Sequence, residues 1–512
     1  MKKIVSILIC VCLITVVFSA CNKKVETSHK TDDSNSKYEA SELDNNTSIN
    51  NSSTESFPDT SSKTDISSDV TSLENFNSSK NENSSLPEDS SQTNDVQLEK
   101  YELPDYNLDS IYLSKFKENN RYIKVLTEAE INDFNSYANK LIATGFTKYD
   151  ENKINNCQFM TLINKDTFVS MSYMASEKKI KVVSEPLGAL YPRAVDNNYT
   201  SIGMQSLFTG MKNQNRPIYS GMGFVIRLDD GSFIIIDGGG GDRNHIDSNN
   251  LLNILKEQSP KGTTKPVIAA WIFTHCHDDH IGVFNAFSDD FHDQVEIKQI
   301  YYSFPLDKDI RKASSFMFDD DYYSYPNFKS IIKAYYSNAD IIRPHSGERY
   351  YIKNAVIEML FTYDDHFPNS FEYGGIGNLN TTSLIFTITI GGQKMMITGD
   401  AETAGMNIVT KNFGNYIKSD FLQLAHHGQN GTESFYSTVN PKYVLMPISH
   451  VDENRVYGNL ANLWLVESVN VRQFISFWNQ NVTIPLPYNP TDAQIYDRIP
   501  NRNTKYYEYP LH

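Results

Sequence analysis

The chain has 512 residues, of which 39% are hydrophobic and 21% charged, and its formal net charge is −16. Affinity for a phosphate backbone needs clustered Lys and Arg, and no such run is present, so the composition gives no strong sign of non-specific nucleic-acid binding. The length accommodates five segments of different composition.

Residues 1–20 have the pattern of a lipoprotein signal peptide. Lys2 and Lys3 precede an apolar run over 4–17, and small residues lead to Cys21. This order predicts cleavage before Cys21 and lipidation of its thiol. We therefore expect an exported protein, lipid-anchored through Cys21 to the outer face of the cell membrane. A membrane-spanning helix is the alternative, although the run is shorter than the roughly 20 residues that spanning needs.

Residues 21–100 are dominated by Ser, Asn, Thr, Asp and Glu and lack an apolar period. Such a composition cannot bury enough apolar surface to fold, so it predicts a disordered tether.

Residues 101–195 alternate helix and strand signals. The stretch 127–130, Thr-Glu-Ala-Glu, predicts a capping box that starts a helix, and Gly145 predicts its end. Three strands are predicted next, at 158–163, 167–173 and 179–183. We predict a small α+β accessory domain for packing or recognition, with a simple spacer as the alternative.

Two β-hairpins are predicted farther along the chain. Apolar runs at 223–228 and 233–239 flank an Asp-Asp-Gly turn, and those at 383–390 and 394–400 flank Gly391-Gly392. The second hairpin ends in Asp400. A shorter apolar strand at 421–425 then leads into His426 and His427.

Residues 275–280 read His-Cys-His-Asp-Asp-His and follow an apolar strand at 269–273. An extended backbone would place His275 and His277 on one face, where they can share an ion. Asp279 and His280 come after the chain turns and are free to address a second ion. A charged, solvated loop is the alternative, but such a loop does not need three imidazoles. Cys276 would point away from the ions and is expected to be a buried structural thiol.

The pattern His-x-His-x-Asp-His after an apolar strand resembles the signature of the metallo-β-lactamase fold superfamily. Asp237 stands where the superfamily places its first motif acid, and Asp400 resembles its metal-bridging aspartate. The segments Asn380 to Ser383, Gly399-Asp400-Ala401 and His426-His427-Gly428 resemble in particular the ComEC-like subgroup, the C-terminal domain of the DNA-uptake competence family. The resemblance implies an α/β fold, a metallo-β-lactamase-like αββα sandwich, over residues 200–485.

The resemblance also implies the ligand set. His275 and His277 would hold the first ion, and Asp279, His280 and one of His426 or His427 the second. Asp400 would bridge both ions. Strand alternation would point His426 and His427 to opposite sides, so that at most one reaches the metal. Asp279 would in addition act catalytically, by accepting a hydrogen bond from the attacking hydroxide.

One departure from the superfamily pattern concerns the first ion. Many superfamily hydrolases carry a further histidine between the first packet and the bridging aspartate. His366 is the nearest candidate here, but an ordinary loop histidine is the better interpretation, with water or substrate completing the first ion.

The chemistry expected of this ligand set is hydrolysis. Two divalent ions can share a hydroxide at neutral pH, which opens ester, amide, lactone and phosphodiester substrates, small or polymeric. We expect zinc because imidazoles dominate the ligands, with manganese as the alternative. Phosphodiesters are favoured by analogy to the nuclease-like competence domains. The alternatives are hydrolysis of esters, lactones or lactams on the same site, and a non-catalytic metal-binding or sensory lipoprotein.

The remaining signals complete the domain. A strand at 442–447, a helix at 458–469 and a strand at 472–477 are predicted, and then an extended C-terminal arm, 486–512, that contains Tyr506, Tyr507 and Tyr509. Of the five cysteines, Cys157 and Cys276 remain in the folded part, and a disulfide between them has no support.

Overall fold

The computed structural model describes residues 99–105, 112–118, 120–209, 221–240, 245–305, 307, 310, 319–367, 378–447, 459–476 and 482–491. The expected signal peptide, Cys21, nearly all of the tether and the three C-terminal tyrosines lie outside these residues. The chain divides into Met1–Ser91 and Gln92–His512, and all described residues belong to the second unit. No helix within the described ranges is long and apolar enough to cross a bilayer.

The N-terminal part of the described chain forms a six-stranded antiparallel sheet with the order β1-β2-β6-β5-β4-β3. Helix α2, Ile131–Ala143, packs Phe134, Tyr137 and Leu141 against one face of this sheet. The three predicted strands are confirmed as β4, β5 and β6. The strands are β1 Tyr112–Glu118, β2 Arg121–Thr127, β3 Thr147–Ile154, β4 Cys157–Ile163, β5 Thr167–Met174 and β6 Lys179–Pro186.

The start of α2 differs from its prediction. Glu130 is the N-cap and forms a reciprocal capping box with Asp133, one turn after the predicted pair. The prediction was wrong because Thr127 pairs with Tyr112 in the β1–β2 ladder and so belongs to a strand. The predicted end is confirmed: Gly145 comes just after the helix with φ +104°.

The second sheet has the order β13-β12-β10-β9-β8-β7-β21, with β11 beside β10. Its central strands, β9 and β10, are parallel, so both end at the same edge. Its strands are β7 Ser206–Thr209, β8 Gly223–Arg227, β9 Phe233–Asp237, β10 Val267–Ile272, β11 Glu296–Ile297, β12 Gln299–Tyr301, β13 Asp340–Ile342 and β21 Val482–Pro485.

The third sheet has the order β14-β15-β16-β17-β18-β19-β20, and β17 to β20 run parallel. Both hairpin predictions are confirmed: β8 pairs with β9, and β16 pairs with β17 across Gly391 and Gly392. Its strands are β14 Arg349–Ile352, β15 Ala355–Phe361, β16 Ile385–Ile390, β17 Gln393–Ile397, β18 Phe421–Gln423, β19 Tyr443–Met446 and β20 Gln473–Ser476.

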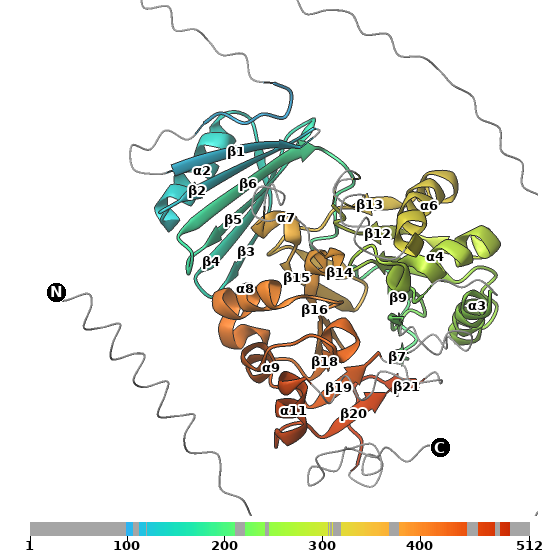
Figure 1. Cartoon of the computed structure of the whole chain (residues 1–512). Helices are drawn as coiled ribbons and strands as arrows, with labels where there is room; N and C mark the ends of the chain where they lie inside the picture. Colours follow the sequence, from blue (N-terminus) through green and yellow to red (C-terminus); the bar gives the residue numbers. More distant parts are fainter. Residues whose placement is uncertain are drawn as a thin grey trace, which may run out of the picture. The chain divides into compact units, whose positions relative to one another are not determined.

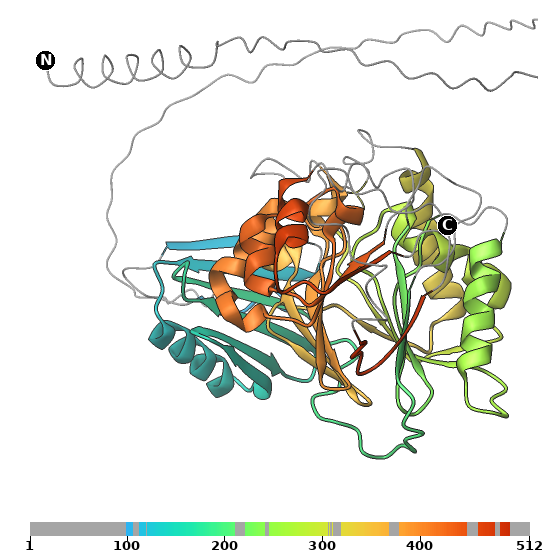
Figure 2. The same cartoon turned by 90° about the horizontal axis from the view of Figure 1, so that it is seen from below.

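Three apolar layers hold these two sheets and their helices together. Side chains such as Ile236 and Phe386 form the central layer between the sheets. Outside the second sheet pack α3 Ile246–Gln258, α4 Asp278–Phe291 and α6 Asp319–Tyr335. Outside the third sheet pack α8 Thr403–Phe413, α9 Glu433–Val439 and α11 Leu460–Glu467. This order of helix, sheet, sheet and helix confirms the predicted αββα sandwich (Figures 1 and 2).

The C-terminal part closes the second sheet. Strand β21 pairs antiparallel with β7, which the sequence did not predict. The described start of the predicted arm packs inward, because Leu486 is buried and the Tyr488 ring lies 4.9 Å from the Tyr443 ring.

Candidate metal centre

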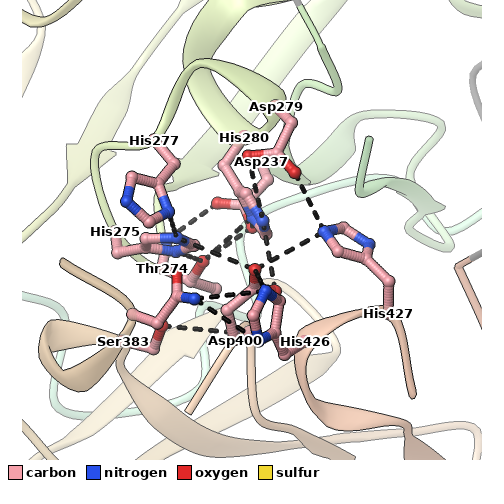
Figure 3. A network of polar contacts seen from close by, with 12 residues as sticks. Asp237, Thr274, His275, His277, Asp279, His280, Ser383, Asp400, His426 and His427 are labelled. Atoms are coloured by element: carbon pink, nitrogen blue, oxygen red, sulfur yellow. Dashed lines mark hydrogen bonds and ion pairs between the residues drawn. The ribbon is translucent and has the colours of Figure 1, made fainter. Parts of the chain in front are cut away.

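The predicted ligands come from three loops that leave parallel strands at one edge of the sandwich, and Asp237 lies at the same edge. Asp237 ends β9, and 274–280 come directly after β10. Asp400 comes three residues after β17, and His426 and His427 come shortly after β18. Because the carboxyl ends of parallel strands meet at one edge, residues far apart in sequence meet there (Figure 3).

The packet residues converge as predicted. The His275 ring is fully buried, and its Nε2 lies 2.9 Å from His277 Nδ1. His277 is the N-cap of α4, which places Asp279 and His280 in the first helical turn. Cys276 is a buried thiol that packs in the outer apolar layer of the second sheet, as expected.

Asp400 lies at the centre of these imidazoles. Its Oδ1 is 3.2 Å from His280 Nε2, and its Oδ2 is 3.9 Å from His275 Nε2 and 3.5 Å from His427 Nε2. The Asp400 backbone N–H donates to Ser383 Oγ at 3.1 Å, which gives Ser383 a part in holding this loop. The carboxylate can therefore face two ligand groups at once.

Two groups of ligand atoms lie close enough to hold an ion each. One contains His275, His277 and Asp400, and the other contains Asp279, His280, Asp400 and His427. Asp400 belongs to both groups, which is the arrangement that a bridging carboxylate requires. His426 belongs to neither group.

The double histidine does not follow the predicted strand alternation. Strand β18 ends at Gln423, and His426 and His427 both adopt left-handed backbone conformations with φ +51°. The predicted strand alternation was therefore wrong, because the backbone is not extended here, but only one of the two histidines, His427, belongs to a ligand group, as expected. His427 Nε2 lies 3.0 Å from Asp279 Oδ2, whereas His426 lies between the side chains of Asn380 and Asn430.

His366 lies away from both ligand groups. It ends the short helix α7, Tyr363–His366, and its ring stacks on Phe361 with centroids 5.1 Å apart. Burial lowers the pKa of His366 to about 4. The structure thus supplies no third imidazole at this position for the first group.

Sequence reasoning singled out Asp237 but missed Thr274 and Trp271, which orient the packet together with it. Asp237 accepts hydrogen bonds from the Thr274 backbone N–H and hydroxyl, both at 2.7 Å, and pairs with His280 Nδ1 at 2.7 Å. Trp271 Nε1 donates to the Asp237 carbonyl at 2.9 Å. A carboxylate on Nδ1 fixes the ring and leaves Nε2 of His280 for an ion. The only available signal was the resemblance that singled out Asp237.

The charges of the centre are mutually compensating. Burial alone would lower the pKa of His280, but the carboxylates of Asp400 and Asp279 hold it well above its usual value. Burial would likewise lower the pKa of His427, but Asp400 and Asp279 raise it to about 10. Although burial favours protonation of Asp400, the His280 and His427 rings keep its pKa well below the ordinary range. A divalent ion bound here would take the place of the protons on these rings.

The donor set fits divalent metal ions. Three polar atoms of the centre are buried and make no well-directed hydrogen bond with another described residue: His280 Nε2, Asp400 Oδ1 and Asn380 Oδ1. Buried polar atoms without hydrogen bonds are costly, by about 1–3 kcal/mol each, unless an ion or ordered water satisfies them. Imidazole nitrogens and carboxylate oxygens that converge around one aspartate match zinc or manganese.

Comparison with known proteins agrees with this arrangement. Residues 219–434 match the model of the metallo-beta-lactamase superfamily. They therefore form a metallo-beta-lactamase superfamily domain with the predicted fold.

Within that superfamily the sequence is ComEC-like. The chain is 33% identical to ComE operon protein 3 of Bacillus subtilis (strain 168) over 112 residues, which are 21% of this chain. It is 32% identical to competence protein ComA of Neisseria gonorrhoeae over 68 residues, 13% of this chain. These alignments span only 14% and 10% of the two relatives. Among solved structures, one that is similar is the metallo-beta-lactamase fold protein YhfI of Bacillus subtilis, with 13% identity and a TM-score of 0.32. The match covers 55% of this chain and 99% of YhfI.

Proposed function

We propose that this protein is a metal-dependent hydrolase that uses two divalent ions and favours phosphodiester substrates. One observation carries the proposal: two groups of mostly buried ligand atoms share the carboxylate of Asp400. A shared carboxylate would keep two ions a few ångströms apart, the spacing used by two-metal hydrolases. A purely structural metal site would need only one closed group of ligands.

The residues of the centre have separate tasks in this proposal. His275 and His277 would hold the first ion, and Asp279, His280 and His427 the second, with Asp400 shared. Two ions bound there would lower the pKa of a water molecule towards neutrality and so provide a nucleophile.

Asp279 is the residue we propose for aiming that nucleophile. Its side chain is 28% exposed, whereas those of His280 and Asp400 are at most 1% exposed. A carboxylate at the edge of the centre can accept a hydrogen bond from the attacking water and later release the proton to solvent.

The substrate preference comes from similarity and from charge. The competence-protein relatives motivate a phosphodiester, while the net charge of −16 disfavours tight, non-specific nucleic-acid binding. We therefore include small or envelope-derived phosphodiesters among the candidates. We also propose that the protein is exported and anchored by lipid on Cys21, which places the reaction outside the membrane.

Hydrolysis of bis-p-nitrophenyl phosphate by the purified full chain tests the activity. We expect turnover that a chelator abolishes and that added Zn²⁺ or Mn²⁺ restores. His277→Ala should remove the activity and keep the fold, whereas His292→Ala should leave both unchanged, because His292 stacks on Tyr335 outside the centre. Turnover on cyclic esters or amides without turnover on phosphodiesters would contradict the substrate class and keep the metal mechanism.

A further inference from the structure

The two ligand groups are unequal. The second contains four side chains, but the first contains only His275, His277 and the shared Asp400. His366, the one candidate for a missing imidazole, packs on Phe361 elsewhere. The first ion would therefore have one protein ligand fewer than the second.

Asn380 supplies a suitable atom near Asp400, to which it is linked through His426. It lies in the 3-10 helix η1, Leu379–Thr382, and its side chain is 1% exposed. The Asn380 Oδ1 atom accepts no hydrogen bond from any residue in the described part of the chain. A buried amide oxygen in that state is destabilising, and an ion or another ligand would satisfy it.

Contacts of both its backbone and its side chain hold Asn380 in place. Its backbone N–H donates to the side chain of Asn378 at 2.9 Å, and its backbone carbonyl accepts from Ser383 N at 3.1 Å. On the amide side, Asn380 Nδ2 lies 3.2 Å from His426 Nε2. His426 Nε2 is in turn 3.8 Å from Asp400 Oδ2, so this amide lies at the edge of the ion groups.

With the Asn380 amide in its observed direction, Nδ2 on His426, the hydrogen bonds of its neighbours follow. If Asn380 Nδ2 donates to His426 Nε2, the neutral imidazole carries its proton on Nδ1. That proton faces the Asn430 amide, 3.0 Å away, whose oxygen accepts it after a half-turn of the amide. Each of the two hydrogen bonds of His426 then has one donor and one acceptor. The carbonyl oxygen of Asn380 is left facing away from His426.

We propose that the side-chain oxygen of Asn380 is a fourth protein ligand of the first ion, and that His426 holds it in position. The inference rests on the proposed metal centre. It explains why a double histidine stands here although one of its members lies in neither ligand group. An amide oxygen is a harder ligand than an imidazole nitrogen. In place of a third imidazole it shifts the preference of the first site towards Mn²⁺.

Metal affinity tests this inference without any substrate. The full chain is loaded with Co²⁺ or Zn²⁺, and the ions are withdrawn with a competing chelator while the bound metal is counted. We expect Asn380→Ala to weaken one of the two ions by about 10–100-fold and leave the other within about threefold of the unsubstituted chain. Asn380→Asp should restore the weakened ion, because it returns an oxygen ligand of the same size.

Asn285→Ala is the matched control. Asn285 is also a buried asparagine whose Oδ1 makes no hydrogen bond with a described residue, but it lies within helix α4 outside both ligand groups. Unchanged affinity for both ions in Asn380→Ala would overturn the inference. A loss equal to that of Asn285→Ala, or one that Asn380→Asp does not restore, would overturn it as well. Two ions bound by the unsubstituted chain without any turnover would instead contradict the proposed activity, so the two failures are distinguishable.

Discussion

At the scale of residues, the two adjacent histidines have different surroundings. His427 is 2% exposed and contacts both Asp279 and Asp400, whereas the His426 side chain is 25% exposed and contacts two asparagines. Both adopt the left-handed conformation that non-glycine residues rarely hold. Such strain costs about 1–3 kcal/mol per residue and is typical of functional sites.

We predict that His427→Ala loses one of two bound ions and lowers kcat/KM by about a hundredfold or more. The reason is that His427 is one of four side chains in the second ligand group. His426→Ala should retain two ions and lower kcat/KM by about tenfold, because its effect passes through Asn380. Elemental analysis beside steady-state kinetics measures both quantities. Equal metal loss in the two variants would contradict the assignment.

The residue types of the centre were predictable, but their partners were not. The spacing of His275 and His277 is a local property, so the extended backbone between them could be inferred from sequence. The choice between His426 and His427 depended on a backbone turn after β18 that the apolar pattern 421–425 does not encode. Thr274 and Trp271 were missed because their role consists of contacts with Asp237, 37 and 34 residues away.

At the scale of elements, the close approach of two strand ends forms the centre. Gly399 comes after β17 with φ +53°, and a Cβ atom there would lie 2.7 Å from Thr274 Cβ. Thr274, at the end of β10, donates to Asp237, and its carbonyl accepts from Leu384 N at 3.0 Å. The packing of Gly399 on Thr274 thus sets the distance between the packet and Asp400.

Gly399→Ala is predicted to lower the free energy of unfolding by about 2–5 kcal/mol and to reduce metal affinity. The loss combines left-handed backbone strain, about 1–2 kcal/mol, with overpacking against Thr274, about 1–3 kcal/mol. Gly392→Ala is the matched control, because Gly392 has φ +75° but no atom within 4 Å of the added Cβ. Denaturant unfolding of the two variants checks this. Equal losses would show that the close approach contributes nothing.

Strands with strong apolar runs were predictable, whereas short or polar ones were not. The hairpins β8–β9 and β16–β17 combine buried runs with glycine turns, which is the clearest local signal for a hairpin. Strand β3, Thr147–Ile154, is mostly polar and only two of its eight residues are buried, so its position depends on pairing with β4. Strand β21 has four residues and pairs with residues more than 270 positions earlier.

At the scale of the whole described molecule, the N-terminal sheet joins the sandwich through a buried ionic cluster. Arg121 Nε lies 3.1 Å from Glu185 Oε2, and Arg121 Nη1 lies 3.3 Å from Asp364 Oδ2. His345 Nδ1 lies 3.0 Å from Asp365 Oδ1, and His345 Nε2 lies 3.5 Å from Glu185 Oε1. Residues from both parts are therefore needed to neutralise the cluster. Sequence analysis could not predict it, because each charge taken alone resembles a solvated surface residue.

The cluster predicts a loss of stability at alkaline pH. Despite burial, Asp365 and Glu185 raise the pKa of His345 to about 10, against about 6.5 for an unfolded histidine. A raised histidine pKa adds stability that is complete below pH 6.5 and disappears as the pH rises through 10. Burial raises the pKa of Glu348 to about 7, so the interval from pH 8 to 10 reports His345 with little contribution from Glu348.

His345→Gln should be less stable than the unsubstituted chain by about 3 kcal/mol at pH 7, because it leaves buried carboxylates without their cation. Its stability should change less between pH 8 and 10. Thermal unfolding at several pH values in that interval measures both effects. Parallel curves for the two proteins would contradict a role for His345 in this linkage.

The central claim, a shared two-ion centre around Asp400, is tested most directly by locating the ions. Crystals of the full chain grown with Zn²⁺ or Mn²⁺ would be measured at wavelengths on both sides of the metal absorption edge. We predict two anomalous peaks, about 3.5–4 Å apart, one beside His275 and His277 and one beside His280 and His427. A single peak at saturating metal, or none, would contradict the two-metal account.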